Sequence, residues 1–141
     1  MGVSIYYSAY RDSGLTDEER RLVEDIADEE TRELLAEIRK RLPAWKERGA
    51  VPGDVESPGE ICEGLPVFPA DDSDDPRELF WGSSKISHGE CEMEVMTMQL
   101  EHYTQFSLGR LRQAVPGAEW HVHIDGTELT WEEEYGEYAL H

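Results

Sequence analysis

Hydrophobic and polar residues alternate from Val3 to Ala9, with Val3, Ile5, Tyr7 and Ala9 on one side. A period of two residues is typical of a strand that has one buried face. The pattern therefore predicts a first strand over Val3–Ala9, and it places Tyr6 and Tyr10 on the polar side of that strand.

A helical period follows the turn at residues 11–14. Thr16 precedes three acids, and Glu19 stands three residues after it, which is the spacing of a capping box. From Leu22 to Leu42 apolar residues recur every three or four positions, although residues 28–31 interrupt the stripe. We expect one long helix or two abutting helices here, ended by Pro43.

Residues 49–78 have a different composition, with five prolines, four glycines and nine acids against the single base Arg77. This composition predicts an acidic loop. We expect the apolar residues at 61–62 and 65–68 to attach the loop to the core. Residues 71–76 should stay solvated and mobile.

The second half of the chain predicts a strand over Leu79–His88 and a long helix over Cys91–Val115. A hairpin follows, because Asp125-Gly126 between two alternating segments is a strong signal for a two-residue turn. Counting outward from that turn gives the expected pairs on its two sides. They are Ile124 with Thr127, Val122 with Leu129 and Trp120 with Trp131, and then His123 with Glu128, His121 with Thr130 and Glu119 with Glu132.

These elements predict a single α+β domain over residues 1–141 with the acidic loop at about 49–78. The expected architecture is an antiparallel or mixed sheet of about four strands, with two long helices packed on one face. The opposite face of the sheet should then present polar and aromatic side chains, namely Tyr6, Tyr10, Lys85 or Ile86, His121 and His123.

The charge of the chain narrows the classes of partner. Thirty-two acids against thirteen bases give a formal net charge of −19, which would repel nucleic acid and an anionic membrane surface. No segment approaches the length of a membrane span, and the N-terminus lacks the pattern of a secretion signal, so we expect a cytoplasmic protein. Two cysteines, Cys62 and Cys91, are too few for a secreted disulfide scaffold and should both be free thiols.

The sequence contains no motif specific enough to assign a reaction. His88, Cys91, His121 and His123 are four potential zinc ligands, but their spacing fits no recognised site and His123 has Glu128 as a cross-strand neighbour. Nucleophile elbows and phosphate-binding glycine loops are absent from the sequence. We therefore predict no catalytic residue, no metal and no cofactor.

Acidic residues next to aromatic ones are the remaining signal, and they suit a basic protein partner. By analogy of surface charge alone, such a protein would act like an immunity protein that covers the positive cleft of a toxin. Two clusters would bind this partner: Asp71, Asp72, Asp74 and Asp75 in the loop, and Trp131, Glu132, Glu133, Glu134 and Tyr135 near the C-terminus.

Three other interpretations remain open. The acidic surface can serve solubility alone. The chain can instead be an enzyme or a metal-binding protein whose site is the polar sheet face, with Tyr6, Tyr10, His121 and His123 as its residues. A homodimer formed through that same face is compatible with either function.

Overall fold

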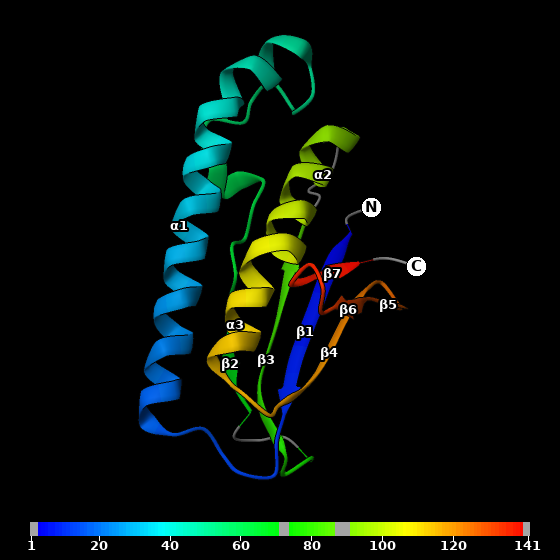
Figure 1. Cartoon of the computed structure of the whole chain (residues 1–141). Helices are drawn as coiled ribbons and strands as arrows, with labels where there is room; N and C mark the ends of the chain where they lie inside the picture. The colour runs from blue at the N-terminus through cyan, green and yellow to red at the C-terminus, as the bar shows by residue number, and fades with distance from the viewer. Residues whose placement is uncertain (1–2, 71–73, 87–90, 140–141) are drawn as a thin grey trace.

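The computed structural model describes residues 3–70, 74–86 and 91–139. Its main sheet has five antiparallel strands in the order β2-β3-β1-β4-β5 (Figure 1). The strands are β1 (Ser4–Tyr10), β2 (Phe68–Pro69), β3 (Glu78–Lys85), β4 (Glu119–Ile124) and β5 (Thr127–Glu128). A second sheet pairs β6 (Thr130–Glu132) with β7 (Glu137–Ala139).

Helices cover one face of the main sheet (Figure 1). The first is α1 (Asp17–Arg48), and the second is a joined helix made of α2 (Met93–His102), the π-helical turn η2 (Tyr103–Ser107) and α3 (Leu108–Ala114). This arrangement confirms the predicted α+β class with two long helices on one face. The sheet has one strand more than expected, but β2 and β5 contain only two residues each.

The core lies between the sheet and the helices, and it follows the predicted alternation of the first strand. Side chains of β1 that point toward the helices are almost fully buried, whereas Tyr6 on the other side is exposed. The fully buried residues include Ile5 and Ala9 of β1, Leu34 and Ile38 of α1, and Leu108 and Leu111 of α3.

The predicted capping box at the start of α1 is confirmed. The backbone N–H of Glu19 donates to Thr16 Oγ1, and the N–H of Thr16 donates to Glu19 Oε1, each over 3.0 Å. Arg11 adds two hydrogen bonds to the same carboxylate at 2.7 and 2.9 Å. The hydrogen bond from Arg11, with those from Thr16, lowers the pKa of Glu19 to about 2.

The prediction that Pro43 ends the first helix is wrong, because α1 continues to Arg48. Pro43 lacks the N–H of one helical hydrogen bond, which is costly inside a helix. The turn after it nevertheless buries Trp45, and burial of a tryptophan ring is among the largest apolar gains in a core. The helix ends one turn later at Gly49, whose φ of 74° is left-handed.

The C-terminal hairpin follows the predicted register only near its turn. His123 pairs with Glu128, Ile124 pairs with Thr127, and the N–H of Leu129 donates to Val122 O over 2.8 Å. The chain then leaves the main sheet to form β6, so the other predicted pairs are wrong. Trp131 lies opposite Tyr138 rather than Trp120, which is opposite Ala9, and the pairs His121 with Thr130 and Glu119 with Glu132 are absent from the described strands.

The departure of β6 places Trp131 against the joined helix. The guanidinium of Arg112 in α3 lies 4.6 Å from the centre of the Trp131 ring. The centres of the Trp131 and Tyr138 rings are 5.1 Å apart. A Cβ at Gly109 would meet the same tryptophan. Covering the end of α3 in this way buries apolar surface that a straight hairpin would leave open, which accounts for the break after Leu129.

The segment predicted as an acidic loop contains the 3₁₀ turn η1 (Pro58–Glu60) and the strand β2. Ile61, Cys62 and Leu65 are buried, as expected, but Phe68 is exposed. The N–H of Leu65 also donates to Thr31 Oγ1 over 2.9 Å, which attaches the segment to α1. Of the expected solvated run, residues 71–73 lie outside the described residues, and Asp74 and Asp75 are exposed.

The predicted boundaries of the next two elements also need correction. The strand expected over Leu79–His88 spans Glu78–Lys85, and residues 87–90 lie outside the described residues. The helix expected over Cys91–Val115 begins at Met93 and ends at Ala114.

Gly82 makes a testable contribution to stability. A Cβ at this position would collide with the Tyr7 ring and with the carbonyl oxygen of Pro66, which accepts a hydrogen bond from the Tyr7 hydroxyl over 2.5 Å. We expect Gly82→Ala to lower the free energy of unfolding in urea by about 1–3 kcal/mol, as overpacking does. Gly14→Ala is the matched control, because a Cβ there meets nothing within 4 Å. Equal stability of the two variants would contradict this assignment.

Candidate functional site

The open face of the main sheet carries a group of aromatic and imidazole rings. Tyr6 lies opposite His123 with ring centres 4.9 Å apart and nearly parallel planes, and Tyr10 meets the edge of His121 at 5.2 Å. These are the four residues that the sequence places on one polar face, and the structure brings them together there. Of the two residues considered for the same face, Lys85 at the end of β3 is partly exposed, whereas Ile86, just after β3, is buried.

Two further aromatic residues of this face escaped the sequence analysis. Phe68 and Trp81 pair across β2 and β3 with ring centres 4.8 Å apart, and they are 43% and 44% exposed. Tyr6, at 40%, lies diagonally from Trp81, since its direct partner on β3 is Ser83. The signal for Trp81 was its alternation with the buried Phe80 and Gly82 along the strand.

Carboxylates gather along one edge of the molecule. Residues 113–139 contain seven acids and neither Lys nor Arg, whereas α1 contains eleven acids together with eight of the thirteen bases. Figure 1 shows β4 to β7 on the side of the molecule opposite α1. We call the following residues the acidic edge: Glu119, Asp125, Glu128, Glu132, Glu133, Glu134 and Glu137.

The predicted partner-binding residues divide into several environments. Trp131 is held by Arg112 and Tyr138, and its indole Nε1 donates to Glu133, so the ring is part of the packing rather than a free anchor. Tyr135, by contrast, is 69% exposed in the turn between β6 and β7.

The acidic loop is not joined to this hairpin. Asp74 and Asp75 precede β3, beside the end of β1, whereas β7 packs on η2 and α3. Asp71 and Asp72 lie outside the described residues. The acidic edge is therefore the larger cluster that the structure describes.

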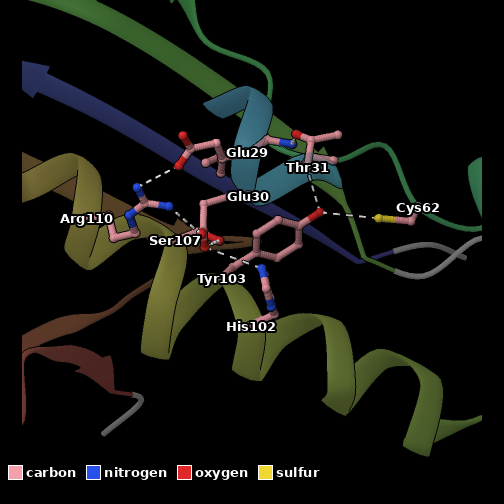
Figure 2. A network of polar contacts seen from close by, with 10 residues as sticks. Glu29, Glu30, Thr31, Cys62, His102, Tyr103, Ser107 and Arg110 are labelled. Carbon is pink, nitrogen blue, oxygen red and sulfur yellow. Dashed lines mark hydrogen bonds and ion pairs between the residues drawn. The ribbon is translucent and has the colours of Figure 1, made fainter. Parts of the chain in front are cut away.

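A buried carboxylate forms the centre of a second polar group, at the contact between α1 and the joined helix (Figure 2). Glu30 is 2% exposed. Its Oε1 accepts a hydrogen bond from Ser107 Oγ over 2.9 Å, and its Oε2 accepts one from Arg110 over 2.9 Å. Arg110 also donates to Glu29 over 2.9 Å, and His102 Nε2 lies 3.4 Å from Glu30 Oε1.

The π-helical turn positions these partners. Residues five apart point to different sides of an α-helix with 3.6 residues per turn, but they come close to alignment across a turn whose hydrogen bond joins i to i+5. The N–H of Leu108 bonds Tyr103 O in this way. As a result His102, just before η2, and Ser107, its last residue, both reach Glu30.

The charge of Glu30 results from opposing effects. Burial raises the pKa of this carboxyl group, but hydrogen bonds from Arg110 and Ser107 outweigh burial and hold the pKa below its ordinary value of 4.5. The anionic form is therefore the stable one at neutral pH. The only sequence signal was an acid in the apolar stripe of α1, four residues after Ile26 and four before Leu34.

Tyr103, the residue after His102, enters a different polar group. Its hydroxyl contacts Ser84 Oγ at 2.9 Å and Cys62 Sγ at 3.7 Å, and it donates to Gly64 O over 2.8 Å. Burial raises the pKa of the Tyr103 hydroxyl and of the Cys62 thiol. Both groups are protonated at neutral pH, so Cys62 is not a reactive thiolate.

Comparisons with protein-family models, curated proteins and solved structures find no match for this chain. Among the described residues, no helix combines the length and apolar composition needed to cross a bilayer. Within the same residues, one group of three potential metal ligands occurs, made of Glu30, Glu33 and His102, and it is not on the sheet face. Neither Cys62 nor Cys91 forms a disulfide bond within the part of the chain that the structure describes.

The pairing of Glu30 with Arg110 predicts a pH-dependent effect on stability. The folded-state pKa of Glu30 lies below the unfolded value, so its contribution is present above about pH 4.5 and is lost as the pH falls through the folded-state pKa. Arg110→Gln leaves the buried carboxylate without its cation. We expect this variant to lose about 1–3 kcal/mol of unfolding free energy at pH 7 and less at pH 3.5.

Arg41→Gln is the control for this prediction, because it removes an exposed ion pair on α1, between Arg41 and Glu37 one helical turn before it. We expect it to cost less than about 0.5 kcal/mol. Urea unfolding of both variants at the two pH values gives the comparison. If Arg110→Gln cost the same at pH 7 and pH 3.5, Arg110 would act through packing and not through the charge of Glu30.

Proposed function

We propose that this protein is a small non-enzymatic binding protein whose partner is a basic protein. The observation that carries the proposal is the density of acids without nearby bases in the sequence: residues 113–139 hold seven acids and neither Lys nor Arg, whereas α1, on the other side of the molecule, holds eight bases beside its eleven acids. A concentrated negative field accelerates the association of a positive protein by about 10- to 1000-fold, whereas scattered carboxylates only keep a protein dissolved.

Exposed aromatic residues next to the acidic edge support the same proposal. Tyr135 is exposed in the hairpin whose acids are Glu133 and Glu134. On the sheet face, the ring contact between Tyr10 and His121 extends the surface from β1 to β4, which begins at Glu119. Aromatic side chains supply anchoring area at interfaces and attract the cations of Lys and Arg.

The alternative, an enzyme or metal-binding protein with its site on the sheet face, has less support. His121 Nδ1 lies 3.5 Å from Glu128 Oε1, an ordinary carboxylate neighbour, and among the described residues no group of three potential metal ligands forms on this face. The potential ligand His88 lies outside the described residues. In the described part of the chain, the three potential metal ligands that converge are Glu30, Glu33 and His102, between the helices and not on this face.

Charge-neutralising variants test the proposed partner. One bait carries Glu128→Gln, Glu133→Gln and Glu134→Gln on the acidic edge, and a matched bait carries Glu24→Gln, Asp25→Asn and Asp28→Asn, which are exposed on α1. Capture from the source cell at ~0.1 M NaCl should retain a basic protein on the natural chain and on the α1 variant. That protein should be lost from the edge variant, and ~0.5 M NaCl should release it.

The retained protein, once purified, allows a quantitative measurement. We expect the edge variant to bind it about tenfold more slowly at low ionic strength, with the difference shrinking as salt is added. The α1 variant should associate at the rate of the natural chain. If no basic protein distinguishes the two variants, the negative surface serves solubility and the proposed function is wrong.

A further inference from the structure

Three metal-binding side chains converge where α1 meets the joined helix. Glu30 and Glu33 stand three residues apart on α1, and His102 is the last residue of α2. One potential ligand atom from each lies within 4.8 Å of the other two. Figure 2 shows Glu30 and His102 facing each other between the helices.

The histidine has a ring nitrogen available for a metal. His102 Nε2 is buried and has no hydrogen-bond partner, although it lies only 3.4 Å from Glu30 Oε1. A buried polar atom without a partner is costly, and it needs an explanation in a folded protein. A bound cation would accept the lone pair of this nitrogen and contact the neighbouring carboxylate oxygen at the same time.

The surroundings also hold the ligands as a metal site requires. Ser107 and Arg110 fix both oxygens of Glu30, and carboxylates that bind metals are themselves held by such hydrogen bonds. Glu29 and Glu30 share the guanidinium of Arg110, and Glu33 lines the same surface hollow as Glu30 and Arg110. A divalent ion would balance the negative charge that remains.

An ion can reach the three ligands from solvent. Glu33 is exposed and lines two neighbouring hollows of the surface, one shared with His102 and the other with Glu30 and Arg110. Tetrahedral zinc with bonds of about 2.1 Å needs ligand atoms about 3.4 Å apart. A rotation of the exposed Glu33 side chain can close the present separation, while Glu30 stays in place.

We propose that Glu30, Glu33 and His102 bind one divalent transition-metal ion, and that Zn²⁺ is the ion they fit best. One imidazole with two carboxylates suits zinc, whereas sites for Mg²⁺ and Ca²⁺ are built from oxygen atoms alone. Three protein ligands leave a fourth position for water. This site is separate from the acidic edge, so it stands whether or not the proposed partner exists.

Calorimetric titration of the full chain with Zn²⁺ at pH 7 tests the site. We expect one ion per chain, with an affinity that falls at least tenfold in both Glu33→Gln and His102→Asn. Glu33→Gln is the variant of choice because the side chain is exposed and its loss should leave the fold intact. Circular dichroism of each variant verifies that it is folded.

Three variants serve as controls, and each tests one alternative location. Glu37→Gln removes an acid one turn further along α1, His121→Asn removes a histidine of the sheet face, and Cys91→Ser removes the potential thiolate ligand. All three should bind Zn²⁺ like the natural chain. The proposal is wrong if the natural chain binds no Zn²⁺ at ~100 μM, if His102→Asn or Glu33→Gln binds it unchanged, or if a control variant loses it.

Discussion

Burial of the Glu30 carboxylate is the constraint on which the packing of the two helices depends. An ionised group almost completely removed from water must have partners for both oxygens, or the folded state loses several kcal/mol. Those partners lie 77 and 80 residues further along the chain, at Ser107 and Arg110. The widened turn η2 brings His102 and Ser107 to the same carboxylate, so the irregularity of one helix lies directly at the buried charge of the other.

The carboxylates of the molecule lie in two chemically different environments. Between the helices, carboxylates are paired with Arg110 and held in place. Along β4 to β7 they are mostly exposed to solvent, and residues 113–139 supply no Lys or Arg, although Arg77 lies 3.6 Å from Glu119. The buried carboxylates between the helices suit a metal ion, and the exposed carboxylates of the acidic edge suit a basic protein. The two proposals therefore concern different surfaces.

Local patterns in the sequence were sufficient for the main elements of the fold. Alternation defined β1, the capping box located the start of α1, and the Asp125-Gly126 turn fixed the first pairs of the hairpin, because each of these features depends on residues close together in the chain. The errors arose where distant contacts decide. Trp45 extends α1 past Pro43, and Arg112 draws Trp131 away from the main sheet.

The candidate sites could be predicted only in part for the same reason. The four residues of the sheet face were found because strand alternation places them together. Glu30 was visible only as an interruption of an apolar stripe, since nothing near it in the sequence indicates Ser107, Arg110 or His102. Phe68 was expected in the core, but its two-residue strand at the margin of the sheet leaves the ring exposed.

The short outer strands have a consequence for how this sheet meets other molecules. At one margin β2 contains Pro69, which has no N–H to donate, and the backbone N–H of Lys85 in β3 is already bonded to Glu63. At the other, β5 offers two residues before the chain turns away at Leu129. Such margins resist extension by a foreign strand. Recognition by this sheet must therefore rely on the chemistry of side chains rather than on shared main-chain ladders.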